Sequence, residues 1–288
     1  MKKLVSIIIT VILIISVFSA CSKAENVQEA QLDFTIDTHY STLDTSVINA
    51  YEKLCTAVIN GEEEVRYNTS LSASVYQLFY TGFPFYALVD KIDSLPDNSG
   101  VLIKYKNDIE THQKLVKEFK TKVLEIVDQC GKGKVSTNEY IFNVYSYVTK
   151  NFVLDNNIYT VFDALINGKG YASAINSLFE YLVLQGGGKA CHITNMEIAS
   201  MISLVEFNGV WYYFNPASEI KDTAGEALKY FAMDVERAGV SYSYTDSLPV
   251  LEQGDDKYSK LSASKSYEVK NASVYIQCTD EEFVLNFN

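Results

Sequence analysis

Residues 168–216 read GKGYASAINSLFEYLVLQGGGKACHITNMEIASMISLVEFNGVWYYFNP. The first half is apolar with the spacing of a helix, and the three glycines at 186–188 favour the end of that helix. The second half is rich in β-branched and aromatic residues, which are typical of strands. Asn208-Gly209 interrupts it, and this dipeptide between two strand-prone runs is the strongest short signal of a hairpin. We therefore expect a helix at about 171–184 and an antiparallel sheet with strands at Lys189–Thr194, Ile198–Phe207 and Val210–Phe214.

The sequence before this stretch predicts a series of helices. An amphipathic pattern between Asp108 and Cys130 favours a long helix, and Gly131 is placed to end it. Ser136 and Glu139 form a capping box, which marks the start of the next helix. Shorter helical runs lie at about 47–58, 74–81 and 159–166, and a strand-prone run lies at 101–105. Helices followed by an antiparallel sheet predict an α+β fold.

The start of the chain has the composition of a secretory leader. Two lysines precede a 15-residue apolar run at 4–18, and small residues follow it. Fifteen helical residues span about 22 Å, which is shorter than the hydrocarbon core of a bilayer, roughly 30 Å. Phe18-Ser19-Ala20-Cys21 resembles a bacterial lipobox, in which the cysteine becomes lipidated. This resemblance implies a signal peptide at 1–20, a lipid anchor on Cys21 and a polar tether at 21–33.

Composition and charge exclude several classes of protein. The chain has 288 residues, of which 48% are hydrophobic and 21% charged, so most of it can fold around a core. The net charge is −12 and no Lys/Arg cluster forms a basic face, so we expect no binding of nucleic acid. The leader and the lipobox predict an extracytoplasmic protein held on the bacterial cell membrane by its lipid. We expect a mostly helical region at 34–135 and a core with C-terminal strands at 136–288, which form one unit.

The cysteines do not indicate a metal site. Beyond the lipobox they are Cys55, Cys130, Cys191 and Cys278, and their spacing contains no C-x-x-C element. We therefore expect no zinc, and nothing in the sequence calls for another cofactor. Four thiols permit three pairings if they pair at all, and buried unpaired thiols are the default interpretation.

Residues 168–216 contain three short motifs whose order and spacing match those of a known protein family. They are Gly168-Lys169-Gly170, Asn208-Gly209-Val210-Trp211-Tyr212 and Asn215-Pro216. In this order the chain resembles the lipoprotein type of the transglutaminase-like superfamily, which has a papain-related fold. Members typically read Gly-Lys-Gly-Val-Cys before a helix, His-Ala-Trp-Asn on a strand, and Asp-Gly-x-Trp-Tyr-x-Val-Asp-Pro on the next. The resemblance extends over about 51–231 and is strongest in 140–217.

The resemblance also implies where the catalytic residues of the family would stand. The family uses a Cys at a helix N-terminus, a His on a neighbouring strand and an Asp or Asn that orients the His. Counted from the landmarks, these positions hold Ala172, Ser200 and Asn215. Alanine has no nucleophile and serine cannot act as an imidazole base, so Asn215 has no base to orient. The resemblance therefore implies a catalytically inactive member, a pseudoenzyme.

The hairpin predicts how two of these positions lie. A two-residue loop pairs Phe207 with Val210, which places Asn215 opposite Ile202 and makes it a diagonal neighbour of Ser200 on one face of the sheet. We expect a candidate cleft there, and Tyr171 is large enough to fill it. The residues of this candidate cleft are Tyr171, Ala172, Ser173, Ser200, Trp211 and Asn215.

Other groups could supply the missing chemistry. Ser173 follows the nucleophile position, but one step along a helix rotates a side chain by about 100°. Cys191 and His192 are adjacent, but neighbouring residues of a strand point to opposite faces. His39 lies near the tether, and the helical pattern places His112 on the polar side of the long helix. We expect neither histidine to act as a base.

These patterns leave three functions open. The favoured one is a catalytically inactive surface lipoprotein that binds or scaffolds a peptide, a protein or a cell-wall polymer. The second is a cysteine peptidase or transamidase that uses relocated groups, with Cys191 as the nucleophile. The third is a purely structural envelope protein.

Overall fold

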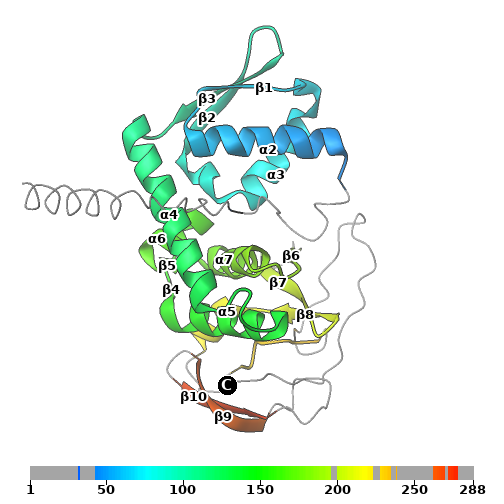
Figure 1. The fold of residues 1–288 in the computed structure, drawn as a ribbon, viewed down its shortest axis with the longest axis vertical. Coiled ribbons are helices and arrows are strands. Elements are labelled where there is room, and N and C mark those ends of the chain that lie inside the picture. Colours follow the sequence, from blue (N-terminus) through cyan, green and yellow to red (C-terminus); the bar gives the residue numbers. More distant parts are fainter. Residues whose placement is uncertain are drawn as a thin grey trace, which may run out of the picture. The chain divides into compact units, whose positions relative to one another are not determined.

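A computed structural model describes residues 43–195, 200–222, 228–234, 262–269 and 272–277, together with Leu32 and Ala238. Contacts between residues divide the chain into two units, Met1–Leu32 and Asp33–Asn288, and the fold below is that of the second. It combines helices with small antiparallel sheets, so the expected α+β class is confirmed (Figure 1). The expected signal peptide, Cys21, His39, Cys278 and, apart from Leu32, the tether lie outside the described residues.

The first part of this unit contains a sheet that the sequence indicated only in part. Its helices are α2 (Thr45–Asn60) and α3 (Ser72–Gly82), with short 3-10 helices at Thr69–Leu71 and Pro84–Leu88. Its strands are β1 (Glu64–Arg66), β2 (Val89–Ser94) and β3 (Gly100–Tyr105), in the antiparallel order β1-β3-β2. Only β3 was expected. The other two strands carry mostly charged, exposed residues, and hydrophobic periodicity cannot detect such strands.

The long helix and its successor form as the sequence predicts. Helix α4 (Ile109–Gln129) begins at Asp108, whose side chain accepts a hydrogen bond from the amide of Thr111, 2.9 Å away. Helix α5 (Thr137–Asn151) begins at Ser136, whose Oγ accepts from the amide of Glu139 at 3.2 Å, as a capping box requires. Both helices bury their apolar faces.

His112 corrects one detail of this helix. The pattern placed it on the polar side of α4, but its side chain is fully buried, with its ring 4.4 Å from that of Tyr105. Its Nε2 lies 2.6 Å from the carbonyl oxygen of Val58, at the end of α2. Because a carbonyl can only accept, Nε2 carries the proton. The helix turn that bears His112 packs on α2, so a polar residue ties the two helices together.

The deciding stretch forms the predicted helix and sheet. Helix α6 (Val161–Asn167) and the short parallel strands β4 (Val153–Leu154) and β5 (Lys169–Gly170) lead into α7 (Ala172–Gln185). The antiparallel sheet then consists of β6 (Ala190–Asn195), β7 (Ser200–Phe207) and β8 (Val210–Phe214) in that order. Helix α8 (Pro216–Lys221) follows, and β9 (Ser262–Val269) pairs with β10 (Ala272–Gln277). Figure 1 shows α7 beside β6 and β7, and nearly all of its side chains are buried.

The hairpin between β7 and β8 has the expected turn and register. Asn208 and Gly209 have φ angles of 54° and 83°, as a type I′ turn requires. The pairing runs from Phe207 opposite Val210 to Ser203 opposite Phe214, so the predicted register is confirmed. The expected pair between Ile202 and Asn215 does not form, because Asn215 leaves the strand and becomes the N-cap of α8.

The buried thiol of Cys130 makes the stability of the fold depend on pH in the alkaline range. Desolvation raises the pKa of Cys130 from 9.0 to about 12, so the folded state keeps this proton to higher pH than the unfolded state does. The resulting stabilisation is complete below about pH 9 and is lost as the pH rises towards 12. We expect the free energy of unfolding to fall more steeply above about pH 9 in the wild type than in Cys130→Ala. Urea unfolding at a series of pH values measures this, and equal slopes would contradict it.

Candidate functional site

The start of α7 holds the position where the resemblance expects a nucleophile. Tyr171 is the N-cap residue and Ala172 is the first residue of the helix, with an exposed methyl group. Gly170 precedes them because a Cβ there would lie 2.9 Å from the Cβ of Ala164, on α6. The glycine thus lets the chain pass close to α6 before α7 begins. The framework around this helix start is in place, but the residue at its first position cannot attack a substrate.

Asn176, one turn further along α7, connects the helix to its neighbours. Its side chain is 2% exposed. The Nδ2 group donates to the carbonyl of Met201 at 2.7 Å and to Oδ1 of Asn215 at 3.1 Å. Its Oδ1 accepts from the amide of Ala217 at 3.0 Å. One buried amide therefore joins α7, β7 and α8.

Asn215 stands at the position of the family's orienting residue, and its side-chain oxygen makes structural hydrogen bonds. Its Oδ1 accepts from the amide of Ser218 at 3.0 Å, which caps α8, and also from Asn176. Both lone pairs of that oxygen therefore have donors within the protein. In this arrangement the side-chain oxygen of Asn215 holds a helix in place.

Strand β7 presents Met201 and Ser203 to α7. Ser203 donates its Oγ–H to the carbonyl of Asn176 at 3.1 Å, and the Oγ of Ser177 lies 3.1 Å from the sulfur of Met201. Ser200 begins the strand and pairs with Asn195. The expectation that Asn215 is its diagonal neighbour in the sheet is wrong. Asn215 lies beyond the end of β8. The first side chain of β7 shown to contact α7 is that of Met201.

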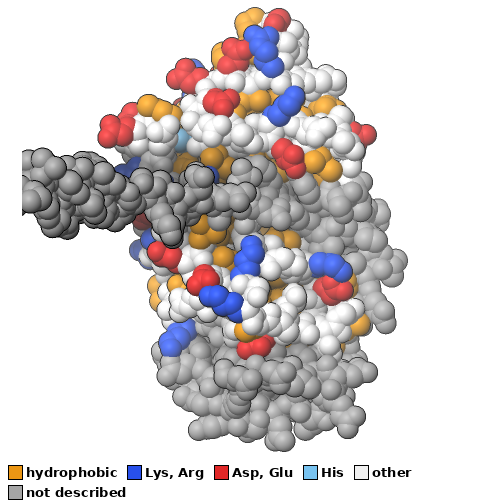
Figure 2. All heavy atoms as spheres, viewed as in Figure 1, with side chains coloured by type: hydrophobic (Ala, Val, Ile, Leu, Met, Phe, Trp, Pro, Cys, Tyr) orange, Lys and Arg blue, Asp and Glu red, His pale blue; other side chains and the backbone are white. Residues whose placement is uncertain are grey.

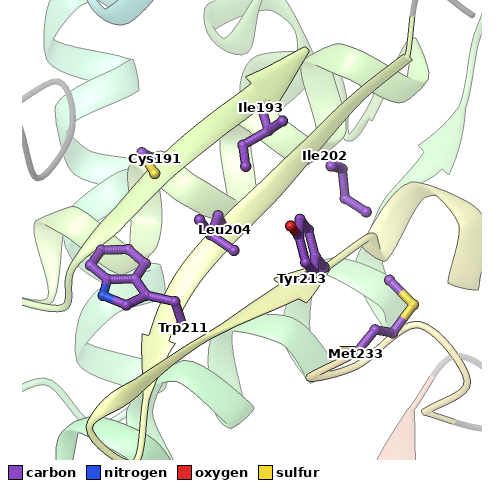
Figure 3. Packing of buried hydrophobic residues seen from close by; sticks show 7 residues of the cluster. All are labelled: Cys191, Ile193, Ile202, Leu204, Trp211, Tyr213 and Met233. Atoms are coloured by element: carbon purple, nitrogen blue, oxygen red, sulfur yellow. The ribbon is translucent and has the colours of Figure 1, made fainter. Parts of the chain in front are cut away.

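The opposite face of the same sheet is an apolar cluster (Figure 3). Cys191 pairs with Leu204 in the ladder, and both side chains lie in this cluster, away from α7. Trp211 is also a member, so it is separated by the sheet from the start of α7, and the expected cleft that grouped it with Ala172 is wrong. The cluster consists of Cys191, Ile193, Ile202, Leu204, Trp211, Tyr213 and Met233.

The surroundings of Cys191 predict an unreactive thiol. Its side chain is 1% exposed and surrounded by apolar groups, so a reagent must wait for the sheet to open. We expect iodoacetamide at neutral pH to modify Cys191 at least about 100-fold more slowly in the folded protein than in urea. Mass spectrometry of the Cys191 peptide over time measures both rates. Rapid modification of the folded protein would contradict this and would revive the cysteine peptidase hypothesis.

Tyr171 does not fill a cleft. Its side chain is 40% exposed, and its ring lies 5.3 Å from that of Tyr159, which is 62% exposed. Ser173 is half-buried in the first turn of α7. The residues expected to line one cleft thus fall into two groups. Tyr171, Ala172 and Ser173 lie at the start of α7, and Trp211 lies across the sheet.

The patterns in the sequence did not indicate the buried polar residues that organise this region. Glu219, on α8, is 3% exposed and accepts hydrogen bonds from the hydroxyl of Tyr145 and the amides of Leu228 and Tyr230, at 2.8, 2.9 and 3.0 Å. A signal existed for Asn176, because an amide within an apolar helix must find partners when it is buried. No such signal existed for Glu219, since α8 has only six residues, too few to show a helical pattern.

Charges and metal ligands add no further site in the described part of the chain. No group of three or more His, Cys, Asp or Glu side chains in the described residues is arranged to hold a metal ion. On the face that Figure 2 shows, acidic and basic side chains are interspersed. No helix among the described residues is both long enough and apolar enough to cross a membrane.

Comparisons with known proteins give little beyond the fold class. No protein-family model matches the chain, and no curated protein matches it. One solved structure with a partial likeness is that of a candidate cysteine protease from Cytophaga hutchinsonii, with 10% sequence identity and a TM-score of 0.26. The matched region covers 33% of this chain and 37% of that protein, so the chain spans little more than a third of its length. This likeness does not by itself assign a family or an activity.

Proposed function

We propose that residues 136–288 form a degenerate transglutaminase-like, papain-related core that binds or scaffolds a partner without cleaving it. Three features support this family. The Gly168-Lys169-Gly170 landmark leads directly into α7, Asn208-Gly209 makes the hairpin, and Asn215-Pro216 begins α8. The partner would be a peptide, a protein segment or a cell-wall polymer.

The observation that carries the proposal is the state of the start of α7. Its first residue is an exposed alanine. Within the described residues, the side chains of Asn176 and Asn215 behind it bond to one another and to backbone groups. A catalytic site needs a nucleophile within reach of a base. Here Asn176 and Asn215 make structural hydrogen bonds, which suits a preorganised binding surface.

We also propose that the protein is anchored outside the cytoplasm through a lipid on Cys21. The support is the leader itself, with its short apolar run and the lipobox-like residues before Cys21. We expect Cys21→Ser to move the protein from the membrane fraction to the soluble fraction, without changing its unfolding curve.

The cysteine peptidase hypothesis receives less support than binding. Cys191 lies in the apolar cluster on the face of the sheet away from α7, and strand alternation separates it from position 192. A thiolate there would be buried among apolar groups, where its charge is disfavoured.

A turnover assay tests the absence of catalysis. Purified protein is incubated with glutamine-containing peptides and a labelled primary amine, and both ammonia release and amine incorporation are followed. We expect neither to exceed the protein-free rate, with an active transglutaminase measured alongside. Turnover that survives repeated purification and is lost in Cys191→Ser or Ser173→Ala would overturn the proposal.

A further inference from the structure

Two exposed tyrosines form a small aromatic platform beside the start of α7. The platform consists of Tyr159 and Tyr171, whose side chains are 62% and 40% exposed. Their ring centroids are 5.3 Å apart and the ring planes meet at 43°, so together they present a shallow aromatic surface to solvent. Exposed aromatic rings in contact with each other offer a flat surface on which a ligand ring can stack.

The backbone beneath the platform is held in place. The amide of Tyr171 donates to the carbonyl of Ile158 at 2.6 Å, which ties the loop before α6 to the start of α7. The amide of Asp155 donates to the carbonyl of Gly170 at 2.8 Å, and the carboxylate of Asp155 accepts from the amide of Asn157 at 2.9 Å. Because the loop is already ordered, a ligand would lose little affinity in fixing it.

Two oppositely charged side chains stand on the same two segments as the rings. Asp155 and Lys169 form an ion pair with 2.8 Å between the carboxylate oxygen and Nζ. The hydrogen bond from Lys169 and that from Asn157 hold the pKa of Asp155 below its usual range, so the carboxylate is an acceptor at neutral pH. The two backbone segments that carry the rings thus also carry a donor and an acceptor, whose charges offset each other.

We propose that this platform binds a chain of uncharged sugar rings. The apolar face of a pyranose ring stacks on an aromatic ring, and its hydroxyls both donate and accept hydrogen bonds, which Asp155 and Lys169 can satisfy. An anionic polymer would find no excess of positive charge there. An apolar helix would need a larger continuous apolar surface than two rings bordered by an ion pair. This inference rests on the proposed function, because it names the class of partner held beside the inactive helix start.

A binding experiment with matched variants tests the inference. The purified full chain is titrated separately with hexamers of β-1,4-linked N-acetylglucosamine, β-1,4-linked glucose and α-1,4-linked glucose. Saturation-transfer NMR follows the sugar protons and calorimetry gives Kd. We expect at least one hexamer to bind, and the double variant Tyr159→Ala/Tyr171→Ala to weaken it about tenfold or more. The double variant Tyr159→Phe/Tyr171→Phe keeps the rings and retains most of the affinity. Tyr80→Ala, which removes a tyrosine of similar exposure (47%) on α3, leaves the affinity unchanged.

Two results would overturn the inference that the platform binds sugar chains. If none of the three hexamers binds at millimolar concentration, or if binding is indifferent to both alanine substitutions on the platform, the inference is overturned. Circular dichroism of each variant shows whether the fold persists, and the phenylalanine variant keeps the test valid if the alanine variant does not fold. Turnover in the amide assay would overturn the proposed function instead, whether or not sugars bind.

Discussion

Replacing Glu219 by leucine is expected to lower the free energy of unfolding by about 3 kcal/mol or more. The buried carboxylate of Glu219 accepts from the hydroxyl of Tyr145 and from the amides of Leu228 and Tyr230. The substitution leaves all three donors without that acceptor, and burial prevents water from replacing it freely. Glu219→Gln keeps the size and one acceptor oxygen, so a smaller loss is expected.

Urea unfolding measures this effect, and an exposed glutamate provides the control. Glu118 forms a long ion pair with Lys122, 3.5 Å apart, on the surface of α4. Glu118→Leu should change the free energy of unfolding by less than about 1 kcal/mol. If Glu219→Leu were as mild as Glu118→Leu, the segment at 228–230 would not depend on the carboxylate, and this account of α8 would be wrong.

Asn176→Leu is expected to destabilise the protein by about 2–4 kcal/mol. Leucine has the same number and branching of side-chain heavy atoms as asparagine. It cannot serve the carbonyl of Met201 or the amide of Ala217, both of which would then be buried without this partner. Because Asn176 also bonds to Asn215, the start of α8 should loosen as well.

Thermal and urea unfolding, with hydrogen exchange of the amides of α8, measure both effects. Asn151→Leu is the matched control, since Asn151 is exposed and makes a single bond to the carbonyl of Tyr147 in its own helix. The control should change stability by less than about 1 kcal/mol. Similar losses for the two variants would show that the hydrogen bonds of Asn176 contribute no more to the free energy of unfolding than the single bond of Asn151.

Local signals in the sequence predicted much of the fold. The hairpin at Asn208-Gly209 was predictable because only a few residue pairs adopt two positive φ angles, and the turn then sets the register of the strands. The start of α5 was predictable because the Ser136 hydroxyl accepts from the amide of Glu139 within one turn. Such features depend on neighbours in the sequence.

Features that depend on distant residues could not be predicted. His112 is buried because its imidazole meets a carbonyl at the end of α2, 54 residues earlier in the chain. Asn215 was expected to continue a strand, but its amide caps α8 and meets Asn176. The assignment of Trp211 to a cleft with Ala172 failed for a similar reason. Sequence spacing from a landmark does not say which side of the sheet a residue faces.

A crystal structure of the protein would show whether the start of α7 holds a nucleophile paired with a base. We expect Asn176 Nδ2 to lie within hydrogen-bond distance of the Met201 carbonyl and of Asn215 Oδ1, with Ala172 exposed beside them. We also expect no imidazole within hydrogen-bond distance of the Ser173 hydroxyl or the Cys191 thiol. An imidazole bonded to either group would identify a catalytic pair and overturn the assignment of an inactive site.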